Sequence, residues 1–177
     1  ISGTGGIWRT DGGIQTFIGC NPTSTGSPRL EGATISTNCL ANGGQASGIG
    51  ASGSASANLV FTNGNLNYTG GTVAIDRGFQ LTGYGVIDVS NAVTTLGFSG
   101  QVVGAGELYK DGAGTMVLAG NNTYTNNTRV RGGILRAGSA TAFGTTNSFW
   151  LDNTAGVLLD VNNFNANAGA LIGGGSL

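Results

Sequence analysis

The sequence of 177 residues contains no histidine, a single lysine, two prolines and two cysteines. Without histidine a Ser-His-Asp triad is excluded, and the commonest proton shuttle and metal ligand of proteins are missing. Two cysteines without histidine do not complete a zinc site, and neither has a partner that would activate it as a catalytic thiolate. We therefore expect no cofactor, no metal site and no serine or cysteine hydrolase in this chain.

Charge is equally scarce. Charged residues make up 8% of the chain, and the net charge is −1. The arginines and Lys110 are scattered singly, so no basic stripe forms. Because nucleic acids are bound by clustered cations that displace counterions from phosphates, we expect no nucleic-acid partner. No apolar run approaches the ~20 residues that a membrane-spanning helix needs, and no basic amphipathic segment suits a lipid surface.

Glycine is abundant, at 35 residues, and hydrophobic residues still reach 39% in short alternating runs. The clearest runs, 107–110, 115–118, 128–131 and 134–136, are separated by brief Gly and Asn turns. Runs this short do not make a sheet alone, so they must pair with copies above and below. The sequence therefore predicts an all-β, right-handed parallel β-helix (a β-solenoid) of about seven to nine coils, each of roughly 20–25 residues. Helix-favouring residues are too few for an α-helical interpretation.

A Tyr-centred pattern recurs at 67–81 and 122–135, in approximate register. In each copy a Tyr between small polar residues is followed by turn formers, an aliphatic run, Gly and a further pair. We interpret Tyr68 and Tyr124 as packed corner residues, with a sugar-binding platform as the alternative. We expect Trp8 and Trp150 to pack at the end coils rather than contact a ligand.

The first third of the chain, 1–57, is less regular and contains both prolines and both cysteines. An isolated cysteine pair in such a chain indicates an oxidising compartment and a Cys20–Cys39 disulfide, with two unrelated buried thiols as the alternative. We interpret 20–39 as a disulfide-closed loop projecting from the solenoid, and 45–57 as a small, flexible surface loop. We expect residues 58–177 to form the regular coils of the same continuous domain, a fragment of a longer chain.

The second Tyr-centred copy and the run before it resemble the passenger-associated transport repeat of bacterial autotransporters. The matching residues are Leu108, Lys110, Gly112, Gly114, Thr115, Leu118, Gly120, Asn122, Tyr124, Thr125, Thr128, Val130, Gly133 and Leu135. Asn126 and Asn127 stand where the family has paired glycines, although that pair is present at 70–71. The likeness extends over about 59–177, including the tail from Asn153.

The resemblance implies a secreted β-helical stalk, exposed at the bacterial cell surface by type V secretion through an outer-membrane barrel outside this chain. Because the chain starts at Ile1 rather than Met, we expect a piece of a longer mature passenger. Such passengers are adhesins, aggregation factors or carriers of enzyme domains. We therefore expect an adhesin or stalk, a virulence function that attaches the cell to a host surface protein, matrix protein or glycan, or to sister passengers. The charged residues Arg29 and Glu31 of the 20–39 loop are the first candidate contacts.

An enzymatic alternative uses carboxylates, because some polysaccharide-degrading enzymes are β-helices whose acids converge from adjacent coils. Asp88 and Asp111 lie about one coil apart, and Asp76 or Glu107 falls nearby. Paired carboxylates divide the acid and base roles of glycoside hydrolysis. However, eight acids spread over many coils produce such a spacing by chance. We expect this chain not to be an enzyme.

Overall fold

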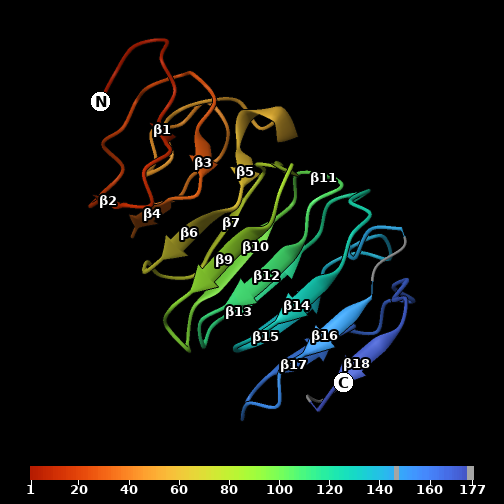
Figure 1. The fold of residues 1–177 in the computed structure, drawn as a ribbon. Coiled ribbons are helices and arrows are strands. Elements are labelled where there is room, and N and C mark those ends of the chain that lie inside the picture. The colour runs from red at the N-terminus through yellow and green to blue at the C-terminus, as the bar shows by residue number, and fades with distance from the viewer. Residues whose placement is uncertain (146–147, 175–177) are drawn as a thin grey trace.

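The structure is a computed structural model that describes residues 1–145 and 148–174. Its strands run parallel and stack into three sheets that wind about a common core, from the N-terminus at one end to the C-terminus at the other (Figure 1). A single short 3₁₀ helix, η1 (Ser56–Asn58), interrupts the β-structure of the described residues. Within the same residues, no helix is both long enough and apolar enough to cross a membrane.

Each sheet takes one strand from successive coils. Sheet A contains β1 (Trp8–Arg9), β3 (Arg29–Glu31), β5 (Val60–Thr62), β8 (Phe79–Leu81) and β11 (Val102–Gly104). Sheet B contains β2 (Ile14–Phe17), β4 (Thr34–Thr37), β6 (Gly64–Tyr68), β9 (Gly85–Val89), β12 (Leu108–Asp111), β14 (Thr128–Val130), β16 (Phe149–Leu151) and β18 (Leu171–Gly173). Sheet C contains β7 (Val73–Ile75), β10 (Thr95–Phe98), β13 (Thr115–Leu118), β15 (Ile134–Ala137) and β17 (Leu158–Asp160).

The pairing register defines the coil. In sheet B, Gly64 pairs with Gly85, and Gly85 pairs with Leu108, so successive coils here are nearly equal in length. The eight strands of sheet B correspond to eight coils, numbered here from β2 to β18. The predicted parallel β-solenoid of seven to nine coils is confirmed.

Alternation along each strand builds the core. Successive residues of a strand point to opposite faces, so every second side chain points into the core. There it stacks on the equivalent side chain of the next coil. On sheet B this inner ladder consists of Ile35, Leu66, Ile87, Lys110, Val130 and Leu151. The rings of Phe61, Phe79 and Phe98 meet edge to face inside, with centroids 5.6 and 5.3 Å apart. Burial of each large apolar side chain contributes roughly 1.5–3 kcal/mol.

The corners need glycine where coils approach most closely. Gly112, after β12, has a φ of +74°, and a Cβ there would clash with the carbonyl of Val89 in the coil below. Only glycine takes this conformation without strain. The Asp-Gly turn therefore fixes the direction in which the chain leaves sheet B.

The segment from Cys20 to Cys39 is not a projecting loop, which corrects the prediction. It contains β3 and β4, which pair on both sides within sheets A and B. The structure joins the two cysteines as a disulfide with Cα atoms 5.3 Å apart, so the bond spans one coil to the next. The alternating patterns of 29–31 and 34–37 decide the local structure, despite the prolines before them.

The prediction of a flexible loop at 45–57 is also wrong. Thr34 pairs with Asn65, so this coil is much longer than those that follow, and the inserted segment folds back against the solenoid. Ile49 is fully buried. The side chain of Arg77, itself buried, donates hydrogen bonds at 2.8–3.4 Å to the Oγ of Ser52 and to the carbonyls of Ala41, Asn42, Gln45 and Gly50. The insertion is thus held by the burial of Ile49 in the core and by the hydrogen bonds of a buried arginine.

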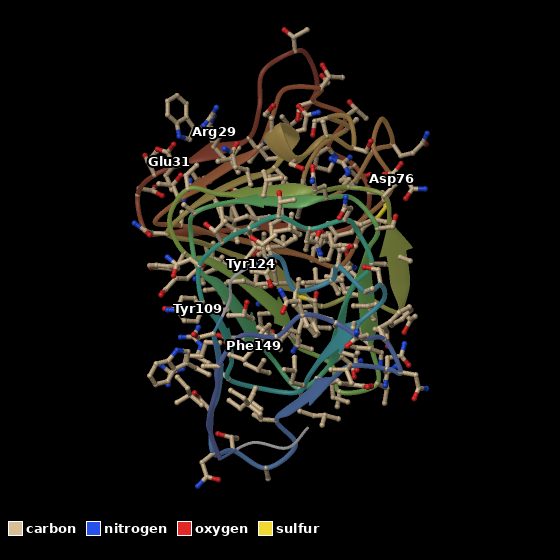
Figure 2. All side chains as sticks on the ribbon, turned by 90° about the vertical axis from the view of Figure 1, so that its right-hand side faces the viewer. Arg29, Glu31, Asp76, Tyr109, Tyr124 and Phe149 are labelled. Carbon is tan, nitrogen blue, oxygen red and sulfur yellow. A yellow bond between two sulfur atoms is a disulfide. The ribbon has the colours of Figure 1, made fainter. Side chains whose placement is uncertain are left out.

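The two Tyr-centred copies do not occupy equivalent corners. Tyr68 ends β6 in sheet B, whereas Tyr124 precedes β14 and lies where the other coils have sheet A. Both side chains are buried, as predicted, and Figure 2 shows Tyr124 inside the outline of the coils. The Oη of Tyr68 donates to the carbonyl of Gly71 at 2.7 Å, and the Oη of Tyr124 shares a 3.0 Å hydrogen bond with Thr128. Burial removes both rings as sugar-binding platforms.

Candidate functional site: an aromatic–arginine row on sheet B

The outer face of sheet B carries large side chains in successive coils. Tyr109, Arg129 and Trp150 are the outward residues of β12, β14 and β16, and the pairing register stacks them directly on one another. We call these three residues the aromatic–arginine row. Trp150 is 44% exposed, so the prediction that it packs against an end coil is wrong.

The row borders a shallow hollow of about 220 Å³. Its lining consists of Glu107, Tyr109, Asn127, Arg129 and Trp150. Glu107 and Asn127 come from the turns that lead into β12 and β14, so they lie beside the first residues of those strands. The hollow is therefore built by three consecutive coils, and no single coil carries it.

Glu107 links Tyr109 and Asn127 through hydrogen bonds to its carboxylate. Its Oε2 accepts a 2.6 Å hydrogen bond from the Tyr109 hydroxyl, and its Oε1 accepts one at 3.4 Å from the Asn127 amide. The hydrogen bond to Glu107, with a smaller effect of burial, raises the pKa of Tyr109. The phenol therefore stays protonated at physiological pH and keeps its donor directed at the carboxylate.

Aromatic and cationic neighbours fix the Tyr109 ring. The edge of Tyr84 meets it at 75°, with ring centroids 5.7 Å apart. The guanidinium carbon of Arg131 lies 4.7 Å from the centre of the Tyr109 ring, within the range of a cation–π contact. A ring held on these sides and through its hydroxyl loses little conformational freedom when a ligand approaches.

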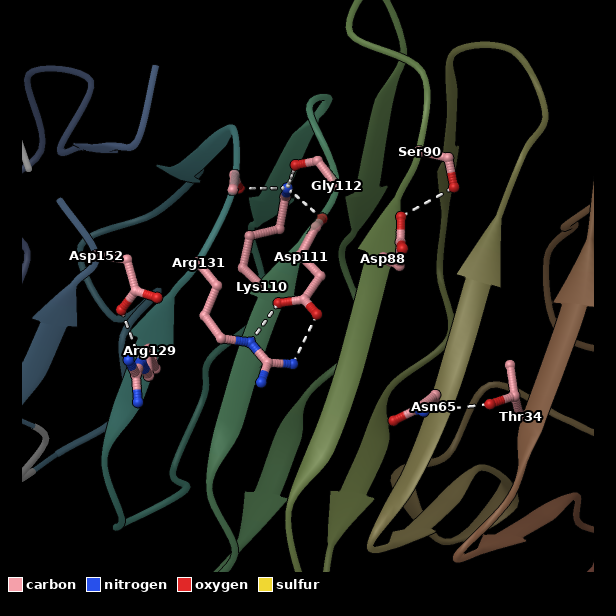
Figure 3. A network of polar contacts seen from close by, with 11 residues as sticks. Thr34, Asn65, Asp88, Ser90, Lys110, Asp111, Gly112, Arg129, Arg131 and Asp152 are labelled. Atoms are coloured by element: carbon pink, nitrogen blue, oxygen red, sulfur yellow. Dashed lines mark hydrogen bonds and ion pairs between the residues drawn. The ribbon is translucent and has the colours of Figure 1, made fainter. Parts of the chain in front are cut away.

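Ion pairs link Arg129 and Arg131 to neighbouring coils (Figure 3). Arg131 pairs with Asp111 in the coil before, at 2.6 Å, and Arg129 pairs with Asp152 in the coil after, at 2.7 Å. The hydrogen bonds to these carboxylates raise the pKa of both guanidinium groups. The bond to Asp152 uses the Nε of Arg129, whose side chain remains 47% exposed. Arg129 is thus oriented by the protein and still accessible.

Lys110 lies behind the row, on the inner face of β12. Its side chain is fully buried between Ile87 and Val130, and its Nζ reaches the corner. There it donates hydrogen bonds to the carbonyls of Asp111, Gly112 and Gly132 at 2.7, 2.9 and 3.0 Å (Figure 3). Burial lowers the pKa of Lys110 to about 8, against the opposing effect of Asp88 and Asp111. The amine joins two adjacent corners and is not presented to solvent.

The carboxylates considered for catalysis are all engaged. Asp88 and Asp111 pair in register, as the spacing predicted, but Asp111 binds Arg131 and Asp88 accepts from the Ser90 hydroxyl at 2.9 Å. Glu107 binds Tyr109, as described above. Asp76 accepts from the Gly43 amide and lies across the solenoid from Tyr109 in Figure 2. The arrangement therefore gives no support to glycan cleavage.

Arg29 and Glu31 lie on β3 in sheet A and do not line the hollow. Arg29 is exposed and pairs in register with Trp8, which is 65% exposed, so the end-packing prediction fails for this tryptophan too. Figure 2 places Arg29, Glu31 and Tyr109 toward the same side of the solenoid. The sequence reasoning did not find the row, although each of its members is the middle residue of an alternating triplet.

Comparison with known proteins agrees with this structure. The passenger-associated-transport-repeat family matches residues 108–137, which include Tyr109, Lys110 and Arg129. The adhesin BmaC autotransporter of Brucella suis biovar 1 (strain 1330) is 52% identical over 179 residues, an alignment that covers 100% of this chain and 5% of that protein. No solved structure matches the chain significantly. The chain is thus a segment of an autotransporter passenger, and it spans about a twentieth of the length of this relative.

Proposed function

We propose that this segment works as an adhesin-type passenger module, which attaches the bacterial surface to host cell or matrix molecules, or to sister passengers. The observation that carries the proposal is the exposed aromatic–arginine row, held by fixed neighbours on a regular solenoid. The 52% identical relative is named an adhesin, which supports the same interpretation. The module acts by binding and carries out no catalysis.

The chemistry of the row suits attachment. Trp, Tyr and Arg are the residues that most often dominate binding energy at interfaces, because they combine a large contact area with directed donors. Here all three project from paired β-strands, and Arg129 and Tyr109 are oriented by Asp152 and Glu107. Little side-chain entropy is lost on binding by groups that are already ordered.

A second candidate contact is formed by the exposed side chains of β1 and β3. The exposed side chains of Trp8 and Arg29 are stacked there, with Glu31 further along the strand. We retain these side chains as a proposed contact because a tryptophan and an arginine again lie side by side. It differs from the row in having no ion pair to Arg29 among the described residues.

Beads coated with the purified chain test the proposal on cultured host cells and on matrix-coated plates. We expect the coated beads to adhere, and Trp150→Ala together with Arg129→Ala to reduce adhesion at least as strongly as the matched pair Trp8→Ala and Arg29→Ala. The same beads, mixed with each other, report self-association. If the wild-type coating neither adheres nor aggregates, the adhesin assignment fails. Release of sugar or peptide fragments from the bound surface would contradict a purely binding role.

A further inference from the structure

We propose that the hollow on sheet B is a binding site for an uncharged glycan, with Trp150 as its stacking platform. This inference rests on the adhesin-type function proposed above and names the chemical class of its ligand. Five features support it: the exposed indole, the planar polar groups around it, the local charge balance, the repeat of the coils and the rigidity of the lining.

Aromatic rings lie at both ends of the hollow. Tyr109 and Trp150 are two coils apart, which at ~4.8 Å per coil separates their Cα atoms by about 10 Å. The apolar C–H face of a sugar ring stacks on an aromatic face, and two rings at this spacing meet sugars that are separated by one further sugar unit. Trp150 offers the more exposed ring, whereas Tyr109 has Arg131 over it and forms the opposite wall.

The polar lining between the rings suits hydroxyl groups. Arg129 lies midway along the row, and Glu107 and Asn127 flank it at the corner. Guanidinium, carboxylate and amide groups are planar and present paired donors or acceptors, which match the adjacent hydroxyls of a sugar. A purely apolar partner would leave these groups desolvated without hydrogen bonds, which is unfavourable.

The local charge disfavours an anionic ligand. Two arginines, Arg129 and Arg131, face three carboxylates at the row: Glu107, Asp111 and Asp152. Each arginine is already paired with one of them, so the site carries no surplus of positive charge. A sulfated or sialylated glycan would gain little attraction from the arginines and would meet the third carboxylate. The structure therefore assigns the site to neutral hexoses and N-acetylhexosamines.

The geometry also gives the direction of the bound chain. The row runs along the solenoid axis, and the next outward residue after Trp150 is Ile172, which is partly exposed. Below Tyr109 the outward residue is Val86, which is buried and offers no ring. A glycan chain would thus lie parallel to the axis and extend from Tyr109 past Trp150 toward the C-terminal coil.

The test is a printed array of neutral oligosaccharides beside an array of sulfated glycosaminoglycans and sialylated glycans, followed by titration of the best neutral oligosaccharide. The proteins compared are the whole chain, Trp150→Ala, Trp150→Phe and, as a control away from both proposed contacts, Ile14→Ala, which changes an exposed side chain of β2. We expect binding to neutral glycans, an affinity about tenfold or more lower in Trp150→Ala, partial recovery in Trp150→Phe and no change in Ile14→Ala. Circular dichroism and thermal melting establish that each variant is folded.

The opposite results overturn the proposal. Binding confined to sulfated or sialylated glycans would reverse the charge argument, and an equal loss in Ile14→Ala would show nonspecific contact. No glycan binding, combined with Trp150-dependent self-association in sedimentation, would make the row a contact between copies of this chain. In that last case bead adhesion or aggregation would persist, so the adhesin function would stand while the glycan assignment failed. If adhesion itself is absent but neutral glycans still bind through Trp150, the site stands and the adhesin function fails.

Discussion

Two regions of this solenoid reach the same fold by different means. From β6 to β17 the coils are nearly equal in length, and apolar ladders with glycine corners hold them together. The first coils, up to β6, include the much longer coil that runs from Thr34 to its partner Asn65. In addition to the apolar core, a disulfide and the buried Arg77 stabilise this region.

The two regions differ in the source of their stability. In the regular coils most inner side chains are apolar and stack on apolar side chains of the next coil, so stability grows with every coil added. An insertion has no equivalent in the next coil and must satisfy its own backbone groups. Arg77 contributes by donating to four carbonyls, of which those of Asn42 and Gly50 also accept from the Gln45 amide and the Ser47 hydroxyl. Irregular coils thus depend on a few specific polar contacts in addition to the shared apolar core, and regular coils depend on many similar contacts.

The largest effect is expected from Arg77→Met. The substitution removes all five hydrogen bonds that the buried guanidinium donates to the insertion, which costs about 3–5 kcal/mol. Urea unfolding measures this loss, with the exposed Arg29→Met as the matched control. Hydrogen exchange should place the loss in residues 41–52, while the amides of β9 to β15 keep their protection. Uniform loss across all coils would contradict the separation of the two regions.

Replacement of both cysteines by serine comes next. The disulfide closes a loop of 19 positions, and its removal costs about 3 kcal/mol in the chain-entropy model. We expect the first coils to unfold at a lower urea concentration and the later coils to be unchanged. The measurement is hydrogen exchange of the β3 and β4 amides compared with those of β12 and β13. Equal protection of β3 and β4 in both proteins would show that pairing alone holds the coil.

A smaller, pH-dependent effect belongs to Lys110. The folded-state pKa of about 8 lies below the ordinary value of 10.5, so the unfolded chain binds the proton more tightly between these values. The free energy of unfolding should therefore rise as the pH increases from about 8 toward 10, by on the order of 2 kcal/mol. Lys110→Met should abolish the rise. Above pH 10 the raised pKa values of buried Tyr68 and Tyr124 reverse the slope in both proteins.

The surface ion pairs give the smallest effect. Asp111→Asn removes the partner of Arg131, but both side chains are partly exposed, so we expect a loss below about 1 kcal/mol. High salt should reduce the wild-type stability by a similar amount and leave the variant unaffected. Thermal melting at low and high salt measures both. A loss of several kcal/mol would mean that the ion pair, and not the inner ladder, holds these coils together.

Most of the regular region was predictable from the sequence, because short alternating runs between Gly and Asn turns have one simple solution. The first coils were harder, since prolines and cysteines around 20–39 indicated a loop while the pattern of Arg29, Leu30 and Glu31 already indicated a strand. The burial of Arg77 left no local signal, because its acceptors are carbonyls distant in sequence.

The candidate site was missed for a related reason. Tyr109, Arg129 and Trp150 are the middle residues of 108–110, 128–130 and 149–151, so alignment of these triplets would have stacked them. The Tyr-centred repeat instead aligned Tyr68 with Tyr124, which lie at different corners. The sequence does not state which residues of adjacent coils pair, because this register depends on the length of each coil.

Spin-label distances along the outer face of sheet B test that register most directly. A label at Thr16, with the second label moved from Asp88 to Asp111, Arg131 and Asp152, samples positions three, four, five and six coils away. Pulsed electron resonance should give distances that increase by about 5 Å at each step. Distances that fail to increase with coil number, or that alternate as in an antiparallel sheet, would contradict the stacked solenoid and the row built on it.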